Sequence, residues 1–150
     1  YPAGMIAVVQ RVVAAKVEVG GQVIGQIGLG LVALVAVVQG DTERDAAWLA
    51  DRLGGLRVFR QGGKYFDISV SQAGGGVLLV SNFTVAADTR RGRRPSFDRA
   101  CPPDQAKALF DDLVRKVAAS GVPVATGEFG GDMQVTLTND GPATFVLESP

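Results

Sequence analysis

The sequence contains no histidine, and this absence excludes several common mechanisms. Without an imidazole there is no histidine base, no Ser-His-Asp triad and no histidine ligand for a metal ion. Catalysis by this chain would have to use hydroxyls, amides, main-chain groups or groups of the substrate itself.

Cysteine and net charge are also scarce. Cys101 is the only cysteine and cannot form an internal disulfide, so we expect a reducing, cytoplasmic location. We interpret it as a small residue ahead of a helix rather than as a nucleophile. The 15 Lys and Arg residues balance the 15 Asp and Glu residues, so any basic surface for RNA must be local.

Long hydrophobic runs are missing as well. The longest, residues 29–38, is too short to span a bilayer and predicts a fully buried strand, so no membrane partner is expected. Glycine, in contrast, is abundant. Its 20 residues are near twice the usual share of ~7% and predict many tight turns.

The length and the first residues indicate the domain organisation. A chain of 150 residues predicts one domain with a sizeable core. Residues 1–4, Tyr-Pro-Ala-Gly, precede Met5 and look like a remnant added ahead of the natural chain. We therefore expect residues 5–150 to form the single domain.

Hydrophobic spacing and turn residues predict two helices among many strands. The first helix begins at residues 41–42 (Asp-Thr) and ends at residues 54–55 (Gly-Gly). The second opens at residues 102–103 (Pro-Pro), carries apolar residues at helical spacing and ends at Gly121. Residues 20–21 (Gly-Gly) predict a tight hairpin turn. Strands are expected at residues 5–13, 16–19, 23–24, 29–38, 56–59, 68–70, 77–80, 122–126, 133–138 and 145–147. The sum is an α+β fold: a curved, antiparallel-rich sheet or barrel with two packed helices.

The first candidate site follows an apolar strand, at the sequence Ser-Asn-Phe-Thr. If the strand continues, Ser81 and Phe83 face one side, whereas Asn82 and Thr84 face the other. A threonine hydroxyl beside an amide can bind a carbonyl or position water, and successive main-chain N–H groups can hold an oxyanion. These four residues are the candidate catalytic residues. An edge strand with ordinary polar side chains is the alternative.

A second polar segment, Asn-Asp-Gly-Pro-Ala-Thr, occupies residues 139–144 near the end of the sequence. Asn-Asp-Gly-Pro is typical of a turn. The simplest interpretation is a hairpin between the two final strands.

A third segment concentrates positive charge. Arg90, Arg91, Arg93 and Arg94 lie within five residues, and Phe97 follows them. Guanidinium groups suit phosphate, and an aromatic ring can stack on a base, so this segment is a candidate RNA-binding loop. A solvated arginine-rich loop is the alternative.

Taken together and in order, these segments resemble the D-aminoacyl-tRNA deacylase family. The resemblance covers essentially all of residues 5–147. It includes Val-Gln-Arg-Val at residues 9–12 and Ser-Asn-Phe-Thr-Val at residues 81–85, where the family usually has Ser-Gln-Phe-Thr-Leu. The further matches are Ala-Asp-Thr at 87–89, Gly-Arg-Arg-Pro-Ser-Phe at 92–97, Asp-Met-Gln-Val at 132–135, and residues 139–144, which fit the family's Asn-x-Gly-Pro-x-Thr. Their joint order and spacing are highly specific.

The resemblance implies hydrolysis of the ester bond of D-aminoacyl-tRNA and of glycyl-tRNA, a proofreading step in translation. It implies a homodimer in which a cis Gly141-Pro142 element enters the partner's pocket. The two main-chain carbonyls of that element would read the amino group and α-carbon and exclude an L-side chain. Asn139 and Thr144 belong to the same substrate-binding element, and Arg11 matches the arginine that braces it.

The resemblance also places Thr84 at the family's active-site threonine. Because no histidine can activate that hydroxyl, we favour attack by water. Main-chain donors near Phe83 and Thr84 and the 2′-hydroxyl of the terminal adenosine would assist it. No metal and no cofactor are needed.

Two departures from the family pattern stand out. Asn82 is one methylene shorter than the usual glutamine, and residues 64–70 differ from the common Lys-Met-Asn-Leu-Ser-Val. A chirality-relaxed sister group of deacylases is one alternative, but its first motif lacks the phenylalanine that Phe83 supplies. A non-catalytic RNA-binding dimer is the other, and it leaves the polar strand end and residues 141–142 unused.

Overall fold

The structure is a computed structural model that describes residues 4–150. Of the proposed remnant, residues 1–3 lie outside the described residues. One long strand, β1 (Ile6–Val19), organises the sheet. Its first half pairs antiparallel with β3 (Gly30–Ala36), its second half pairs antiparallel with β2 (Gln22–Ile27), and β8 (Gln134–Glu148) runs antiparallel along both halves.

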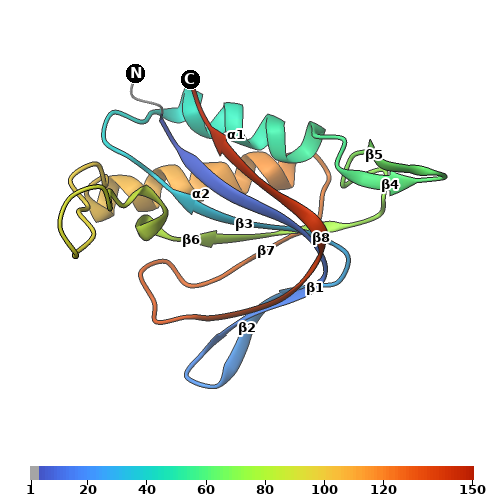
Figure 1. Cartoon of the computed structure of the whole chain (residues 1–150), viewed down its shortest axis with the longest axis horizontal. Helices are drawn as coiled ribbons and strands as arrows, with labels where there is room; N and C mark the ends of the chain where they lie inside the picture. The colour runs from blue at the N-terminus through green and yellow to red at the C-terminus, as the bar shows by residue number, and fades with distance from the viewer. Residues whose placement is uncertain (1–3) are drawn as a thin grey trace.

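The sheet continues through two parallel pairings and curls back on itself. β3 pairs with β6 (Gly76–Ser81), and β6 pairs with β7 (Val124–Thr126). β7 then approaches β2 so closely that a Cβ on Gly25 would lie 2.2 Å from the carbonyl oxygen of Thr126. The mixed sheet is therefore nearly closed as a barrel, as Figure 1 shows, and the predicted fold class is confirmed.

The two predicted helices are present and have the expected ends. α1 (Glu43–Gly55) begins with a capping box in which Thr42 and Asp45 each hold the other's main-chain N–H. α2 (Pro103–Ala119) begins at its prolines, and Gly121 follows it at a φ of 90°. The helices pack side by side on one face of the sheet (Figure 1).

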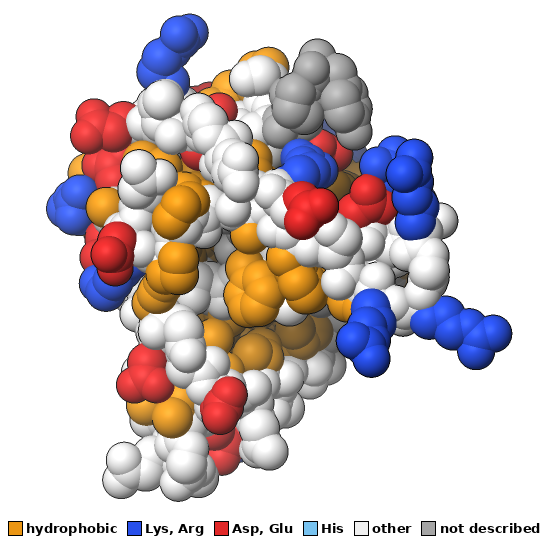
Figure 2. Space-filling view, turned by 90° about the vertical axis from the view of Figure 1, so that its left-hand side faces the viewer, with side chains coloured by type: hydrophobic (Ala, Val, Ile, Leu, Met, Phe, Trp, Pro, Cys, Tyr) orange, Lys and Arg blue, Asp and Glu red, His pale blue; other side chains and the backbone are white. Residues whose placement is uncertain are grey.

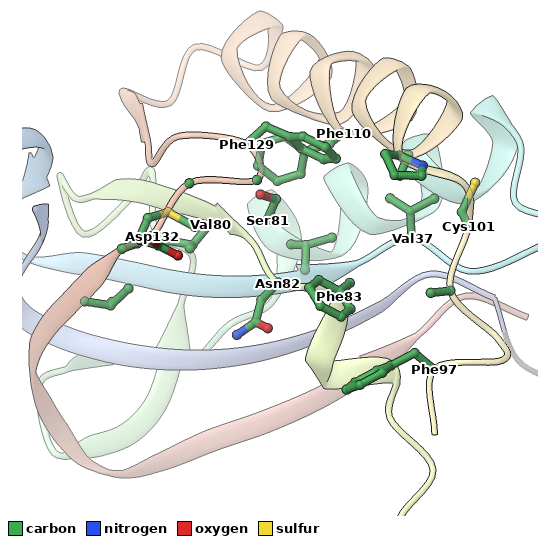
Figure 3. Close-up of a pocket in the computed structure, with 18 residues that line it drawn as sticks. Val37, Val80, Ser81, Asn82, Phe83, Phe97, Cys101, Phe110, Phe129 and Asp132 are labelled. Atoms are coloured by element: carbon green, nitrogen blue, oxygen red, sulfur yellow. The ribbon is translucent and has the colours of Figure 1, made fainter. Parts of the chain in front are cut away.

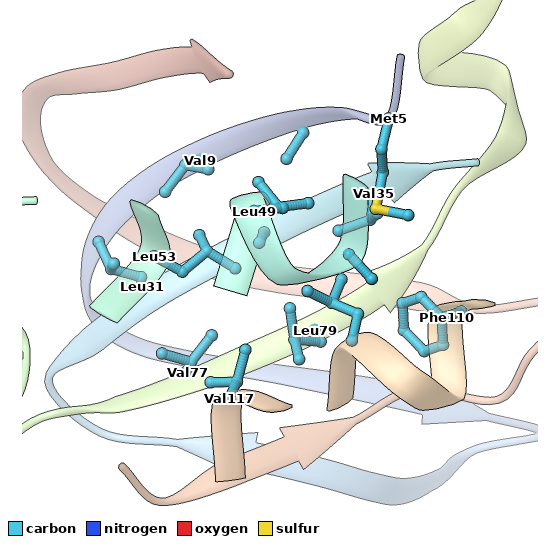
Figure 4. Packing of buried hydrophobic residues seen from close by; sticks show 14 of the residues in the cluster. Met5, Val9, Leu31, Val35, Leu49, Leu53, Val77, Leu79, Phe110 and Val117 are labelled. Atoms are coloured by element: carbon cyan, nitrogen blue, oxygen red, sulfur yellow. The ribbon is translucent and has the colours of Figure 1, made fainter. Parts of the chain in front are cut away.

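Alternation along the strands creates two apolar layers. In β6, Val77 and Leu79 face the helices, whereas Leu78 and Val80 face the barrel interior. Figure 4 shows how the helix residues close over the strands in the first layer. Its members include Val9, Leu31, Val35, Leu49, Leu53, Phe110, Leu113 and Val117. This layer holds β6 and the start of α2 in place, and both border the site described below.

Three local predictions differ from the structure. The predicted strands at 56–59 and 68–70 are displaced into a short hairpin, β4 (Phe59–Gln61) and β5 (Lys64–Ile68), which turns at Gly62 with a φ of 59°. Residues 139–142 form no hairpin turn, because β1 is long enough to pair with β8 on both sides of them. The pairing of β1 with β8 is irregular at these residues, where its register shifts.

The third difference concerns the end of β6. The strand stops at Ser81, and η1 (Phe83–Ala86) is a 3-10 helix rather than a continuation of the strand. The Asn82 side chain caps this helix, which explains the change of direction. Within residues 4–150, no helix is long and apolar enough to cross a membrane.

Candidate active site

A cavity of about 600 Å³ opens where β6 ends beside the start of α2. Its floor and walls are largely apolar, and Ser81, Asn82 and Asp132 contribute polar groups. In Figure 3 the Ser81 side chain points toward Phe129, which lies across the cavity. Figure 2 shows the hollow lined by hydrophobic side chains, with Lys and Arg side chains gathered along one side. An apolar cleft with a few polar groups is the usual form of a small-molecule site.

Two aromatic rings stand at this cavity. Phe83 of η1 is 58% exposed and meets Phe97 edge to face, with ring centroids 5.0 Å apart and planes at 68°. An apolar ring this exposed is free to contact a ligand. The structure thus brings together residues 81–83 and Phe97, which lie in separate motifs of the sequence.

The side-chain amide of Asn82 accepts both hydrogen-bond donors of Thr84. Its Oδ1 accepts the main-chain N–H of Thr84 at 3.1 Å and also accepts the Thr84 hydroxyl. The N–H of Thr84 is therefore already occupied. The N–H of Phe83, at the first position of η1, has no acceptor within that helix and can serve a ligand. Thr84 is exposed and is not among the residues that line the cavity.

The arginine segment forms a loop beside the cavity, closed by an antiparallel bridge between Asp88 and Ser96. Arg90 makes a two-pronged contact with the Asp88 carboxylate, with Nε–Oδ1 at 2.9 Å and Nη2–Oδ2 at 2.7 Å. This contact holds the pKa of Asp88 well below its usual range. Arg91, Arg93 and Arg94 are exposed.

The Gly141-Pro142 element lies in β8 at the bend, and its peptide bond is cis. Both residues are exposed. They do not line the cavity, and Figure 1 places the bend of β8 on the side of β4 and β5, away from η1. Within one chain, the cavity and this element do not form one site.

The buried side chain of Arg11 is hydrogen-bonded to the bend of β8. Its side chain is 1% exposed, and its Nε donates to the main-chain oxygen of Asp140 at 3.0 Å and lies 3.1 Å from the carboxylate. Its Nη1 donates to the main-chain oxygens of Val58 (2.8 Å) and Tyr65 (3.2 Å). One guanidinium thus connects β1, the β4–β5 hairpin and β8.

The side chains of Asn139 and Thr144 point to the bend itself. Asn139 Nδ2 donates to the main-chain oxygens of Arg11 (3.0 Å) and Ala143 (3.2 Å). Thr144 Oγ1 accepts from Gln10 Nε2 at 3.1 Å, across the β1–β8 pair. These contacts hold the backbone of the Gly141-Pro142 element in shape.

Sequence reasoning missed two residues near this element. The Tyr65 hydroxyl donates to the Pro142 carbonyl at 3.3 Å, and Arg60 Nη2 lies 2.8 Å from an Asp140 carboxylate oxygen. The one available signal was the departure of residues 64–70 from the family pattern. Among residues 4–150, no group of three or more His, Cys, Asp or Glu side chains is arranged to hold a metal ion.

Comparison with known proteins gives a consistent result. Residues 8–148 match the family described as D-Tyr-tRNA(Tyr) deacylase. The D-aminoacyl-tRNA deacylase of Geobacter sulfurreducens is 50% identical over 145 residues, covering 97% of this chain and 95% of that protein. That of Bacillus licheniformis is also 50% identical over 145 residues, covering 97% and 99%.

Solved structures share the fold. The c-Myc DNA Unwinding Element Binding Protein superposes with a TM-score of 0.91 at 36% identity, covering 97% of this chain and 99% of that one. A structure described as a probable eukaryotic D-amino acid tRNA deacylase superposes with a TM-score of 0.82 at 14% identity, covering 96% and 98%, which shows the fold alone.

Fold and matched sequence together define a hydrolase family that acts on the ester bonds of aminoacyl-tRNA. The chain belongs to the D-aminoacyl-tRNA deacylase family.

Proposed function

We propose that this protein hydrolyses the ester bond of D-aminoacyl-tRNA and of glycyl-tRNA and spares L-aminoacyl-tRNA. Selection against L-aminoacyl-tRNA at a site shared by two subunits is supported by one observation, the separation of two exposed features within one chain. An apolar cavity with polar groups opens at the end of β6, and the Gly141-Pro142 carbonyls lie outside it, at the bend of β8. Because charged tRNA is the substrate, we place the activity in the cytoplasm.

The cavity suits the terminal nucleoside of tRNA. Its volume of about 600 Å³ is ample for such a group. Phe83 and Phe97 offer ring faces and edges to a base, and the arginines of residues 90–94 offer guanidinium groups to the preceding phosphates. This arrangement directs the aminoacyl ester toward Ser81 and the start of η1.

The proposed wall against L-amino acids comes from a second subunit. In a two-fold homodimer the same patch of each subunit meets the other, so each Gly141-Pro142 element can reach the partner's cavity. Its carbonyls accept hydrogen bonds from the substrate's amino group. An L-side chain then runs into main-chain atoms, whereas a D-side chain points away, and glycine has no side chain to reject.

The chemical step we favour is attack by water on the ester carbon. The Thr84 hydroxyl donates a hydrogen bond to the amide oxygen of Asn82. An amide oxygen cannot act as a base at neutral pH, so this contact does not make the hydroxyl a nucleophile. The Phe83 N–H stabilises the developing oxyanion. The bond from carbon to the ribose oxygen breaks, and the 2′-hydroxyl passes the proton of the attacking water to that oxygen.

A mixed dimer tests the shared site. Ser81→Trp fills the cavity. Gly141→Val places a Cβ 2.2 Å from Asn139 Oδ1, so the Asn139 side chain must shift from its hydrogen bonds to the main-chain oxygens of Arg11 and Ala143, which hold the bend. Each homodimer should be inactive on D-tyrosyl-tRNA and on glycyl-tRNA. A mixed dimer purified through two different tags should regain about half of the unsubstituted activity, because one of its two sites combines an intact cavity with an intact wall.

Sedimentation and circular dichroism of both variants provide the control for folding and dimerisation. A folded mixed dimer as inactive as its parents, or an active monomer of the unsubstituted protein, would overturn the shared site.

A further inference from the structure

Tyr65 of β5 lies beside the Gly141-Pro142 element and has no role in the steps described above. Its hydroxyl donates to the Pro142 carbonyl, with an oxygen–oxygen distance of 3.3 Å. We propose that Tyr65 is a positioning residue for chiral selection: it fixes the direction of the Pro142 carbonyl before substrate binds. This inference rests on the proposed role of Gly141-Pro142 as the wall.

Two guanidinium groups contact the Tyr65 ring. The guanidinium carbon of Arg11 lies 4.4 Å from the ring centroid, and that of Arg60 lies 4.2 Å from it. The neighbouring Phe66 ring meets Tyr65 edge to face at 4.7 Å. Cation–π contacts of this kind restrict the ring, so the hydroxyl is presented in one place.

Arg11 depends on the ring in return. Its Nη2 is buried and has no hydrogen-bond partner among residues 4–150. The aromatic faces of Tyr65 and Phe66, at 4.4 and 5.5 Å from the guanidinium carbon, are the favourable surroundings of this group. The ring of Tyr65 therefore supports the fold locally, and its hydroxyl is the part available for positioning.

Asp140, the residue before Gly141, is held by ion pairs. Its carboxylate lies 2.8 Å from Arg60 Nη2 and 3.1 Å from Arg11 Nε. The hydrogen bond from Arg60 lowers the pKa of Asp140, with a further contribution from Arg11, so the carboxylate is charged at neutral pH. The residues on both sides of Gly141 are thus tied to the same two arginines, Asp140 directly and Pro142 through Tyr65.

This bracing leaves the carbonyl able to bind substrate. A carbonyl oxygen has two lone pairs, and Tyr65 uses one of them. A carbonyl that is already oriented loses less freedom on binding, and it also cannot retreat from an L-side chain. Removing the hydroxyl alone should therefore weaken binding of the correct substrate and relax exclusion of the wrong one.

Tyr65→Phe is the decisive variant, because it keeps the ring in contact with the two guanidinium groups and removes only the hydroxyl. The ratio of kcat/KM for D-tyrosyl-tRNA to that for L-tyrosyl-tRNA should fall about threefold to tenfold, the equivalent of one ordinary hydrogen bond. The melting temperature should stay close to that of the unsubstituted protein. A purely structural role would lower both rates together and leave the ratio unchanged.

Arg57→Leu is the matched control on the same hairpin. It removes the hydrogen bonds from Arg57 to the main chain (2.6 Å) and side chain (3.1 Å) of Asp67, which do not involve Pro142. Its D-to-L ratio should equal that of the unsubstituted protein.

An unchanged ratio in Tyr65→Phe, with an unsubstituted protein that prefers the D-substrate, would overturn the positioning role and leave the proposed function standing. An unsubstituted protein without D-preference would overturn the proposed wall and this inference with it.

Discussion

Asn82 and Thr84 form a hydrogen-bonded pair at the start of η1. The amide of Asn82 reaches back to the N–H and hydroxyl of Thr84 two residues along the chain. Such a local contact from a short polar side chain is typical at the start of a helix. It caps η1 and directs the Thr84 proton away from any substrate.

Thr84→Ala should consequently keep deacylation of D-tyrosyl-tRNA within about tenfold of the unsubstituted rate, because the substitution removes only a positioning group. Removal of a true nucleophile would lower the rate by on the order of 10⁶-fold. Single-turnover hydrolysis measures the difference, with Thr84→Ser as the control that retains a hydroxyl. Complete loss of turnover with normal tRNA binding, or an acyl-enzyme trapped in the unsubstituted protein, would contradict attack by water.

At the scale of elements, Asp41 lies two residues ahead of α1 and is a carboxylic acid whose pKa is raised toward neutrality. Burial raises the pKa of Asp41 to about 6, and the nearby charge of Asp45 adds to this effect. Main-chain N–H groups of Val38 and Met5 and the charge of Arg99 oppose it. The folded state thus binds a proton at this group more readily than the unfolded state does.

The protein should therefore become more stable as the pH falls from 7 to 5. Because the folded pKa lies above the unfolded value, stability lost when Asp41 ionises is regained on protonation. The gain should be less than about 1 kcal/mol over this interval, because the carboxyl group is only half-buried and solvent screens its charge. Asp88 and Asp140, whose pKa values are lowered, oppose this trend only at more acidic pH. Urea unfolding at the two pH values measures the change.

Asp41→Asn provides the comparison, since the amide oxygen can still accept the Val38 N–H that Asp41 accepts at 2.8 Å. Its free energy of unfolding should vary less between pH 7 and pH 5. Equal pH dependence in the two proteins would show that another group is responsible.

At the scale of the whole molecule, charge is balanced in number but not in position. The formal net charge is zero, yet residues 90–94 carry four arginines in the loop that ends beside Phe97 of the cavity. Asp88 engages Arg90 through both carboxylate oxygens. Arg93 and Arg94 are therefore the better choices for testing contact with phosphate.

Replacing Arg93 and Arg94 together by alanine should weaken binding of D-aminoacyl-tRNA and glycyl-tRNA equally, because an arginine bound to phosphate carries no information about the amino acid. The slope of log affinity against log salt should fall by about one for each phosphate that the variant no longer neutralises. Affinities measured across a KCl series test both statements. Weaker binding restricted to one aminoacyl group would place the loop against the amino acid instead.

Much of the architecture was readable from local signals. The apolar spacing and end residues of α1 and α2, the Gly20-Gly21 turn and the buried strand β3 all depend on neighbours within a few residues. The same holds for the motifs that identified the family. Their side chains and order are written in the chain, and no tertiary contact is needed to recognise them.

The tertiary structure alone decided how these parts meet. The sequence predicted a turn at residues 139–142, but β1 is long enough to pair with β8 on both sides of them. The curl of the sheet brings β7 close to β2. Tyr65 reaches Pro142 across 77 positions of sequence. No local pattern encodes such a contact, because it depends on the twist and register of strands distant in the chain. The same geometry keeps the Gly141-Pro142 carbonyls out of the cavity, since the cavity opens at the end of β6 and the carbonyls lie at the bend of β8.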